Sequence, residues 1–281
     1  PTPTPVTSNQ PPITKPQFST SNSVPILSAV ATAKQLLQAE LATRALQKKN
    51  NYASKPSSVD IVLAVWNSKT GTIALMNAVK SGKKISLKSG DLQIQVVRDN
   101  GLSSRYTISD GMNVVVGEIY PIFTKKIVKK KTTYTMKEMV YVPPSAEFFT
   151  PAVYGAGSDY LSFLIQDAFS ELRTKQIRSV AFPDKLVADV VDPFLIKSII
   201  VSEHTSPQSL LRGDSEGTIE AFLVNLAINQ DDAYDLSLST AGAVGLAQFI
   251  PSTYKLMVKN RPAYNLIPDF TAGMRNHQNA I

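Results

Sequence analysis

The spacing of the apolar residues changes twice along this 281-residue chain, and this change restricts the fold more than any other feature of the sequence. Over 59–142, short β-branched and aromatic runs such as VDIVLAVWN, DLQIQVV and NVVVGEIYPIF alternate with turn-like segments such as SGD, RDNG and SDG. On either side the apolar residues recur at helical spacing. The pattern predicts an α+β protein in which a small, mainly antiparallel β domain, at 59–143, lies between helical segments.

The segments outside the β region divide into three parts. Residues 1–25 are rich in Pro, Thr, Ser, Asn and Gln, a composition typical of an extended, flexible lead-in. Residues 26–50 have apolar side chains near helical spacing, so we expect an N-terminal helix there. After 144–151 the sequence becomes helical again, with a helix expected to start at Ser158 and Asp159. Residues 152–281 therefore predict an all-α C-terminal domain.

Composition restricts the chemistry that the chain can perform. It contains no cysteine, which excludes disulfides, thiolate metal sites and a cysteine nucleophile. The two histidines, His204 and His277, lack further ligands at metal spacing, so we expect neither a metal nor a cofactor. A net charge of +7 favours an acidic partner, such as a wall polymer, a lipid headgroup surface or nucleic acid. No apolar run has the length of a transmembrane helix.

The lysine-rich run KKIVKKK at 125–131 has two interpretations. It can grip an anionic polymer, or it can be an edge strand whose lysines prevent sheet-to-sheet aggregation, and the second interpretation is favoured. Because the chain lacks the combined aromatic and basic motif typical of nucleic-acid binding, we do not expect a nucleic-acid partner. The ligand of the β domain stays open, and another envelope protein is one candidate.

A candidate acid lies at the end of an expected helix in VVDPFLIKSIIVSEH. Asp192 suits the N-cap and Pro193 the first helical position, so we expect the helix to run to about Glu203. Three isoleucines share a face with this glutamate: Ile196, Ile199 and Ile200. Burial and the negative end of the helix dipole both raise the pKa of a carboxyl group, as a general acid requires. The alternative, a glutamate in water beyond the last buried turn, is favoured when this helix is considered by itself.

The stretch STAGAVGLAQFIPSTY at 239–254 combines two glycines with one glutamine and one proline. Gly242 and Gly245 permit backbone geometry or close approach that a side chain prevents, and Gln248 supplies an amide that both donates and accepts. Such a segment suits a backbone-lined groove for a ligand rich in hydroxyl and amide groups. A tight helix crossing with glycines at the contact explains the same residues when the segment stands alone.

The same stretch resembles the signature of the soluble-type lytic transglycosylases of the lysozyme-like superfamily, which is close to S-x-x-G-A-x-G-L-M-Q-x-M-P-x-T. The positions that coincide are Ser239, Gly242, Ala243, Gly245, Leu246, Gln248, Pro251 and Thr253. The resemblance covers residues 182–281 and excludes the N-terminal helix and the β domain. It implies a lysozyme-like α domain that acts on the glycan strands of bacterial peptidoglycan, in the cell envelope or secreted, in the periplasm or at the cell surface.

The resemblance also implies a role for individual residues. Glu203 would be the catalytic acid and base, Ser239, Gly242 and Gln248 would line the sugar subsites, and Ile250 would occupy a methionine position that packs against substrate. The reaction that the resemblance implies is a lyase cleavage of the β-1,4 bond between MurNAc and GlcNAc that forms 1,6-anhydroMurNAc without added water. Because the acetamido oxygen of the substrate stabilises the anomeric centre, a second catalytic carboxylate is unnecessary.

Several differences from the family pattern bear on this interpretation. His204 stands where the family has serine after the catalytic glutamate, and Ala247 stands where it has methionine. The segment that follows Glu203 is longer than usual, includes an expected extra helix in TIEAFLVNLAIN, and is similar in length to that of the membrane-bound B-type branch. It makes Glu216 and Glu220 rival acids.

Both ends of the chain carry expectations. The family has a further helix that supplies a tyrosine, so the domain at 152–281 is expected to be truncated at its C-terminal end, which leaves the activity of this chain open. Because the chain starts at Pro1 without a charged and apolar leader, we expect the numbering to begin after a removed leader or at a boundary introduced by cloning.

Two other functions stay open. A hydrolysing lysozyme of the inverting kind needs a second carboxylate about 6.5 to 9.5 Å from the first. The longer segment offers Asp214, Asp231, Asp232 and Asp235 for that role. A non-catalytic wall-binding or assembly module would instead bind glycan in the same groove and a partner through the β domain.

Overall fold

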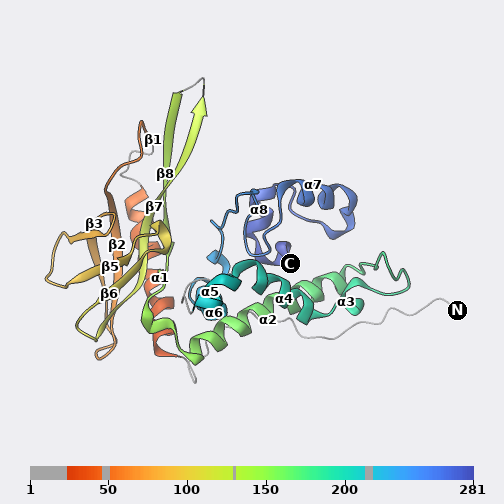
Figure 1. Cartoon of the computed structure of the whole chain (residues 1–281), viewed down its shortest axis with the longest axis horizontal. Coiled ribbons are helices and arrows are strands. Elements are labelled where there is room, and N and C mark those ends of the chain that lie inside the picture. The colour runs from red at the N-terminus through yellow and green to blue at the C-terminus, as the bar shows by residue number, and fades with distance from the viewer. Residues whose placement is uncertain (1–23, 46–50, 129–130, 213–217) are drawn as a thin grey trace. The chain divides into compact units, whose positions relative to one another are not determined.

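The computed structural model describes residues 24–45, 51–128, 131–212 and 218–281 (Figure 1). The described residues form a mixed α+β protein with an antiparallel sheet, as the change in apolar spacing predicts. They divide into two compact units. The sheet unit comprises Thr20–Ser158 and His204–Asp235, and the helical unit comprises Asp159–Glu203 and Leu236–Ile281. Residues 1–23 of the expected lead-in lie outside the described residues, as do 129–130 of the lysine run.

The sheet unit contains a six-stranded antiparallel sheet with the strand order β1-β8-β7-β2-β3-β4, and a separate β5-β6 hairpin. The strands are β1 (Asn51–Tyr52), β2 (Val59–Asn67), β3 (Ile73–Ser81), β4 (Lys84–Leu87), β5 (Ile94–Arg98), β6 (Arg105–Ile108), β7 (Asn113–Val128) and β8 (Lys131–Tyr141). Strand β2 pairs with β3 on one side and β7 on the other. It is therefore a central strand.

Strand β2 is buried on both faces, which explains its nearly continuous apolar sequence. On one face its odd-numbered residues, Ile61, Leu63 and Val65, pack with the β5-β6 hairpin. Helix α1 (Pro25–Ala45) packs against the other face, where a Cβ on Gly117 of β7 would lie 2.6 Å from Leu37 Cδ1. The close approach of α1 therefore depends on a glycine in the sheet. This helix starts at Pro25, one residue before the range 26–50 expected from sequence, of which 46–50 is outside the described residues.

Helix α6 (Ile219–Asn229) corresponds to the extra helix expected from TIEAFLVNLAIN. The buried Asn229 side chain accepts a hydrogen bond from the Val142 N–H (2.9 Å) and donates one to the Val142 carbonyl (3.0 Å). An amide side chain thus takes the place of a neighbouring strand for the backbone that follows β8. The sheet unit also contains α5 (Pro207–Arg212) and the 3₁₀ helices η1 (Gly101–Ser103), η2 (Ala146–Phe148) and η3 (Gln230–Asp232).

The helical unit has no strand longer than a single bridge among its described residues. Helix α2 (Pro151–Thr174) begins in the sheet unit and continues into the helical unit. It is followed by α3 (Val187–Val190), α4 (Pro193–His204), α7 (Pro251–Asn260), η4 (Pro262–Tyr264), α8 (Phe270–Arg275) and α9 (His277–Ala280). None of the helices in the described part of the chain is long and apolar enough to span a bilayer.

Two expected helix limits are wrong. Helix α2 starts at Pro151 instead of Ser158, because Pro151 suits a first helical position and Thr150 Oγ1 accepts from the Val153 N–H (3.4 Å). The helical spacing of Phe270, Met274, His277 and Ile281 predicts a single helical face up to the end of the chain. This face is interrupted, since Asn276 has an extended backbone and caps α9.

Candidate functional site

Helix α4 presents the candidate acid, Glu203, at its C-terminal end. The helix begins as expected, because the Phe194 N–H donates to the Asp192 carboxylate (2.8 Å). The expected apolar shielding of Glu203 is wrong: of its three isoleucine neighbours only Ile200 is buried, Ile199 is 46% exposed, and Glu203 itself is exposed. Helical spacing places these residues on one face but does not determine whether another element covers it.

The signature segment folds as a closed loop at 236–250 that leads into α7. Ser239 and Ala243 form its first turn, since the Ser239 N–H donates to the Ala243 carbonyl (2.9 Å) and Ser239 Oγ accepts from the Ala243 N–H (3.0 Å). The second turn is joined by a bridge between Val244 and Phe249. Leu246 is fully buried and anchors the loop. Backbone hydrogen bonds therefore fix the positions that the family pattern associates with sugar subsites.

The two signature glycines are needed for different reasons. Both have left-handed backbones, with φ of +81° at Gly242 and +76° at Gly245. A Cβ on Gly245 would lie only 2.1 Å from the Met274 carbonyl oxygen, whereas a Cβ on Gly242 would have nothing closer than Pro251 Cδ at 3.9 Å. Gly245 thus permits the loop to pack against α8, and Gly242 only makes a turn.

Gln248 also has a positive φ, of +51°, and its side chain folds back on its own loop. Its Nε2 donates to Ser237 Oγ (2.9 Å) and to the Gly245 carbonyl (2.7 Å). Both hydrogen bonds that the described residues give this side chain therefore use the nitrogen. Ile250, 37% exposed, is the N-cap of α7 and lies on the surface.

The structure brings four of the five predicted site residues together in one loop: Ser239, Gly242, Gln248 and Ile250. Glu203 belongs to the same helical unit, although the intervening His204–Asp235 belongs to the sheet unit. No hydrogen bond or ion pair between described residues joins Glu203 to the loop. Of the rival acids, Glu220 is exposed at the start of α6 and Glu216 lies outside the described residues.

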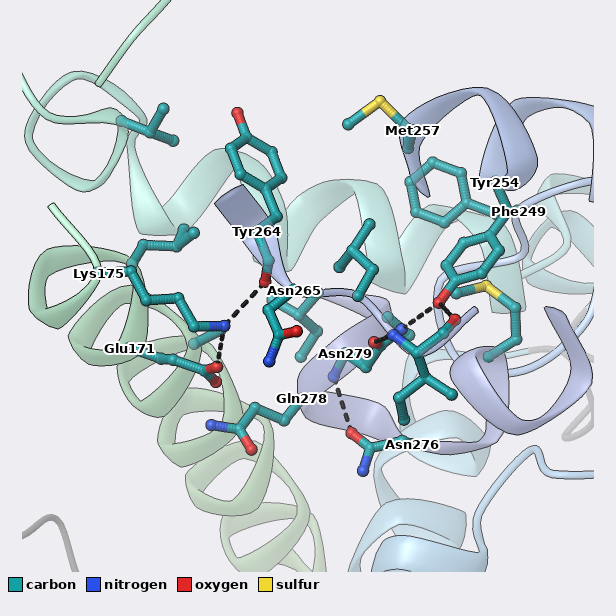
Figure 2. Close-up of a pocket in the computed structure, with 18 residues that line it drawn as sticks. Glu171, Lys175, Phe249, Tyr254, Met257, Tyr264, Asn265, Asn276, Gln278 and Asn279 are labelled. Atoms are coloured by element: carbon teal, nitrogen blue, oxygen red, sulfur yellow. Dashed lines mark hydrogen bonds and ion pairs between the residues drawn. The ribbon is translucent and has the colours of Figure 1, made fainter. Parts of the chain in front are cut away.

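A cavity of about 350 Å³ lies in the helical unit next to the loop (Figure 2). One wall is apolar, with Phe249, Tyr254 and Met257, while Glu171 and Lys175 of α2 form an ion pair at the other side. Phe249, the residue that follows Gln248 in the loop, therefore lines the cavity.

Tyr254, in the apolar wall of this cavity, is held by a network of hydrogen bonds to its hydroxyl. Its hydroxyl donates to the Ile267 carbonyl (2.6 Å) and accepts from Asn279 Nδ2 (2.8 Å), as Figure 2 shows. A Cβ on Gly273 would lie 2.1 Å from the same hydroxyl. Sequence reasoning missed this network, although the glycine before Met274 was a signal for close packing.

Sequence reasoning also missed a buried carboxyl group in the sheet unit. Glu118 of β7 is fully buried and accepts a hydrogen bond from the Tyr106 hydroxyl (2.7 Å), while its other oxygen has no partner among the described residues. Desolvation raises the pKa of Glu118 to about 8, against the opposing effects of the Tyr106 hydrogen bond and the positive charge of Lys80. Lys80, also buried, forms an ion pair with Asp99, whose pKa is lowered chiefly by that hydrogen bond. Because Glu118 has no access to solvent, its role is structural.

The two histidines pack against aromatic side chains. The ring of His204 lies 3.9 Å from that of Tyr234 and 5.6 Å from that of Phe222, all within the sheet unit. His277 is buried, with Nδ1 3.3 Å from the Tyr160 hydroxyl. Across the described residues, no group of three or more His, Cys, Asp and Glu side chains is arranged to hold a metal ion.

Comparison of the chain with known proteins adds no family to this description. No protein-family model matches it. No curated protein matches it, and no solved structure does. The function must therefore be inferred from the residues and their geometry.

Proposed function

We propose that this protein is a peptidoglycan lytic transglycosylase and that its helical unit is a lysozyme-like catalytic domain. The observation that supports it most is that the end of α4 and the signature loop belong to one compact unit, although the chain between them belongs to the other. The substrate would be the glycan strand, so the protein would act in the cell envelope or after secretion.

In the proposed reaction a single carboxyl group does the proton transfers. Glu203 protonates the glycosidic oxygen between MurNAc and GlcNAc as that bond breaks. The resulting carboxylate then takes the proton of the MurNAc C6 hydroxyl, whose oxygen closes on C1 and gives the 1,6-anhydro product. Because Glu203 is exposed in the free protein, the bound glycan itself would have to exclude water from this group.

The signature loop would hold the sugars beside this carboxyl group. With Nε2 of Gln248 engaged inside the loop, its carbonyl oxygen is the atom that could accept from a sugar hydroxyl or acetamido N–H. Ser239 and Gly242 would line the same subsites through the turn that they form, and the exposed Ile250 would pack against a sugar face. The hydrogen-bonded loop would be pre-organised for this binding.

The exposure of Glu203 favours a second candidate, a non-catalytic wall-binding or assembly module with the same groove. A hydrolysing lysozyme is a third, and it requires a second carboxylate near the first. Of its candidates, Asp214 lies outside the described residues. Asp231, Asp232 and Asp235 belong to the sheet unit, and Asp232 lies 3.6 Å from the Lys34 ammonium.

Purified sacculi test the proposal when binding and release are measured separately. We expect Glu203→Gln to pull down with sacculi as the unmodified chain does but to release no soluble fragments. Glu147→Gln, at an exposed glutamate of the sheet unit, is the matched control and should release them normally. Equal release by Glu203→Gln would assign the acid elsewhere, and binding without release by the unmodified chain would favour the non-catalytic module.

A further inference from the structure

Strands β7 and β8 run beyond the other long strands of the sheet as a two-stranded ribbon (Figure 1). Strand β2 pairs with β7 only as far as Ile119, whereas β7 and β8 stay paired from Glu118 to the Val128–Lys131 pair. We call residues 122–128 and 131–137 the distal ribbon. Among the described residues, its one further partner strand is the two-residue β1, at Tyr134 and Thr135.

The pairing register assigns the side chains of the distal ribbon to two faces, since directly opposed residues share a face. One face carries lysines, threonines and one isoleucine: Ile122, Thr124, Lys126, Lys131, Thr133, Thr135 and Lys137. The other face carries Phe123, Lys125, Ile127, Thr132, Tyr134 and Met136. Lysines therefore lie on both faces, and the distal ribbon has no acidic residue.

The face that carries Phe123, Ile127 and Met136 is covered near the sheet but exposed farther along the ribbon. Tyr52 of β1 has its ring 5.5 Å from that of Phe123 and its hydroxyl 3.5 Å from Met136 Sδ, and Met136 is buried. Farther out, Ile127 is 62% exposed and shares its face with the exposed Lys125, while the exposed Lys126 and Lys131 lie on the other face. This part of the ribbon therefore combines an exposed aliphatic side chain with lysines on both faces.

The side chains of the distal ribbon indicate the kind of partner that it fits. The distal ribbon contains no arginine, the residue that recognises phosphates in a fixed two-pronged geometry, so its charges suit diffuse anionic surfaces. A bilayer offers anionic headgroups directly above an apolar layer, so one surface can meet both the lysines and the exposed isoleucine. Charge and apolar exposure thus favour the same surface.

We propose that the distal ribbon binds an anionic lipid bilayer, with its lysines at the headgroups and Ile127 at the boundary with the acyl chains. Each lysine near such a surface contributes about fivefold to the partition coefficient, an effect that salt screens. The ribbon would hold the protein at a membrane surface without crossing it, independently of what the helical unit does.

Co-sedimentation with vesicles tests the proposal. Vesicles of phosphatidylcholine with about a third phosphatidylglycerol should bind the unmodified chain at low salt, and vesicles of phosphatidylcholine alone should not. The triple variant K125T/K126T/K131T should bind the anionic vesicles about a hundredfold more weakly, with threonine chosen because it keeps the strand. Ile127→Thr, which changes no charge, should also weaken binding.

The control removes the same charge elsewhere in the sheet unit, at the exposed residues Lys55, Lys69 and Lys83. The variant K55T/K69T/K83T should lose much less binding than the ribbon variant. Equal losses in the two triple variants would mean that net charge alone attracts the protein, and would overturn the proposal. Failure of the unmodified chain to bind anionic vesicles, with lysine-dependent binding to sacculi or to nucleic acid instead, would overturn it too.

Discussion

The buried carboxyl group of Glu118 makes the stability of the sheet unit depend on pH. Glu118→Gln keeps the shape of the side chain and an oxygen that can accept from Tyr106, but it removes the ionisable group. A carboxyl whose folded-state pKa is raised contributes its full stability below the pKa of the unfolded chain and loses it as the pH rises to the folded-state value. The unmodified protein should therefore become less stable across that interval, and the variant should not.

The size of the effect follows from the two pKa values. Burial raises the pKa of Glu118 from its ordinary value of 4.5 to about 8. Each unit is equivalent to 1.36 kcal/mol, so the penalty is about 3 kcal/mol near pH 7 and somewhat over 4 kcal/mol near pH 8. Relative to the unmodified protein, Glu118→Gln should gain about 3 to 4 kcal/mol in free energy of unfolding between about pH 5 and pH 8.

Urea unfolding followed by tryptophan fluorescence reports on the sheet unit, which contains Glu118, because the single tryptophan, Trp66, lies in β2. Glu147→Gln, at an exposed glutamate of the same unit, is the control and should leave the pH dependence unchanged. If the difference between Glu118→Gln and the unmodified protein stays constant over this pH range, Glu118 is ionised in the folded protein and the reasoning is refuted.

Two further predictions concern backbone contacts. Gly242→Ala should cost about 1 kcal/mol of stability, because alanine is strained in the left-handed backbone at this position. Gly245→Ala should cost about 3 kcal/mol or more, because its Cβ would also meet the Met274 carbonyl. Equal losses of the two variants in urea unfolding followed by circular dichroism would contradict this. Asn229→Ala should cost about 2 to 4 kcal/mol, since it leaves the Val142 N–H and carbonyl without a partner. Tryptophan fluorescence in urea measures this loss, and one below about 1 kcal/mol would mean that water replaces the amide.

The local elements could be predicted where the sequence carries a local cause. The alternation over 59–142 predicts the antiparallel strands, and Asp192 with Pro193 predicts the start of α4, because strand pleat and helix capping are properties of neighbouring residues. The start of α2 was missed because two glycines follow Pro151 and weaken the helical pattern. One of them, Gly157, serves a contact with Leu223, far away in the sequence.

The environment of single side chains could not be predicted in the same way. The spacing of Ile199 and Glu203 gives a shared face, but whether a face is covered depends on elements distant in the chain, and here it is exposed. The converse holds for Glu118, which follows a run of valines and one glycine in β7. Tyr106 of the β5-β6 hairpin, which packs against the sheet, donates a hydrogen bond to it, and this contact depends on strands that are not neighbours of Glu118 in the sheet.

The products of peptidoglycan digestion test the proposed function most directly. Intact sacculi are incubated with the unmodified chain, and the released muropeptides are identified by mass spectrometry without prior reduction. The proposal predicts fragments that end in 1,6-anhydroMurNAc, which are lower in mass by one water than hydrolysis products. Fragments with only reducing ends would contradict it in favour of a hydrolase, and the absence of any released fragment would contradict catalysis by this chain.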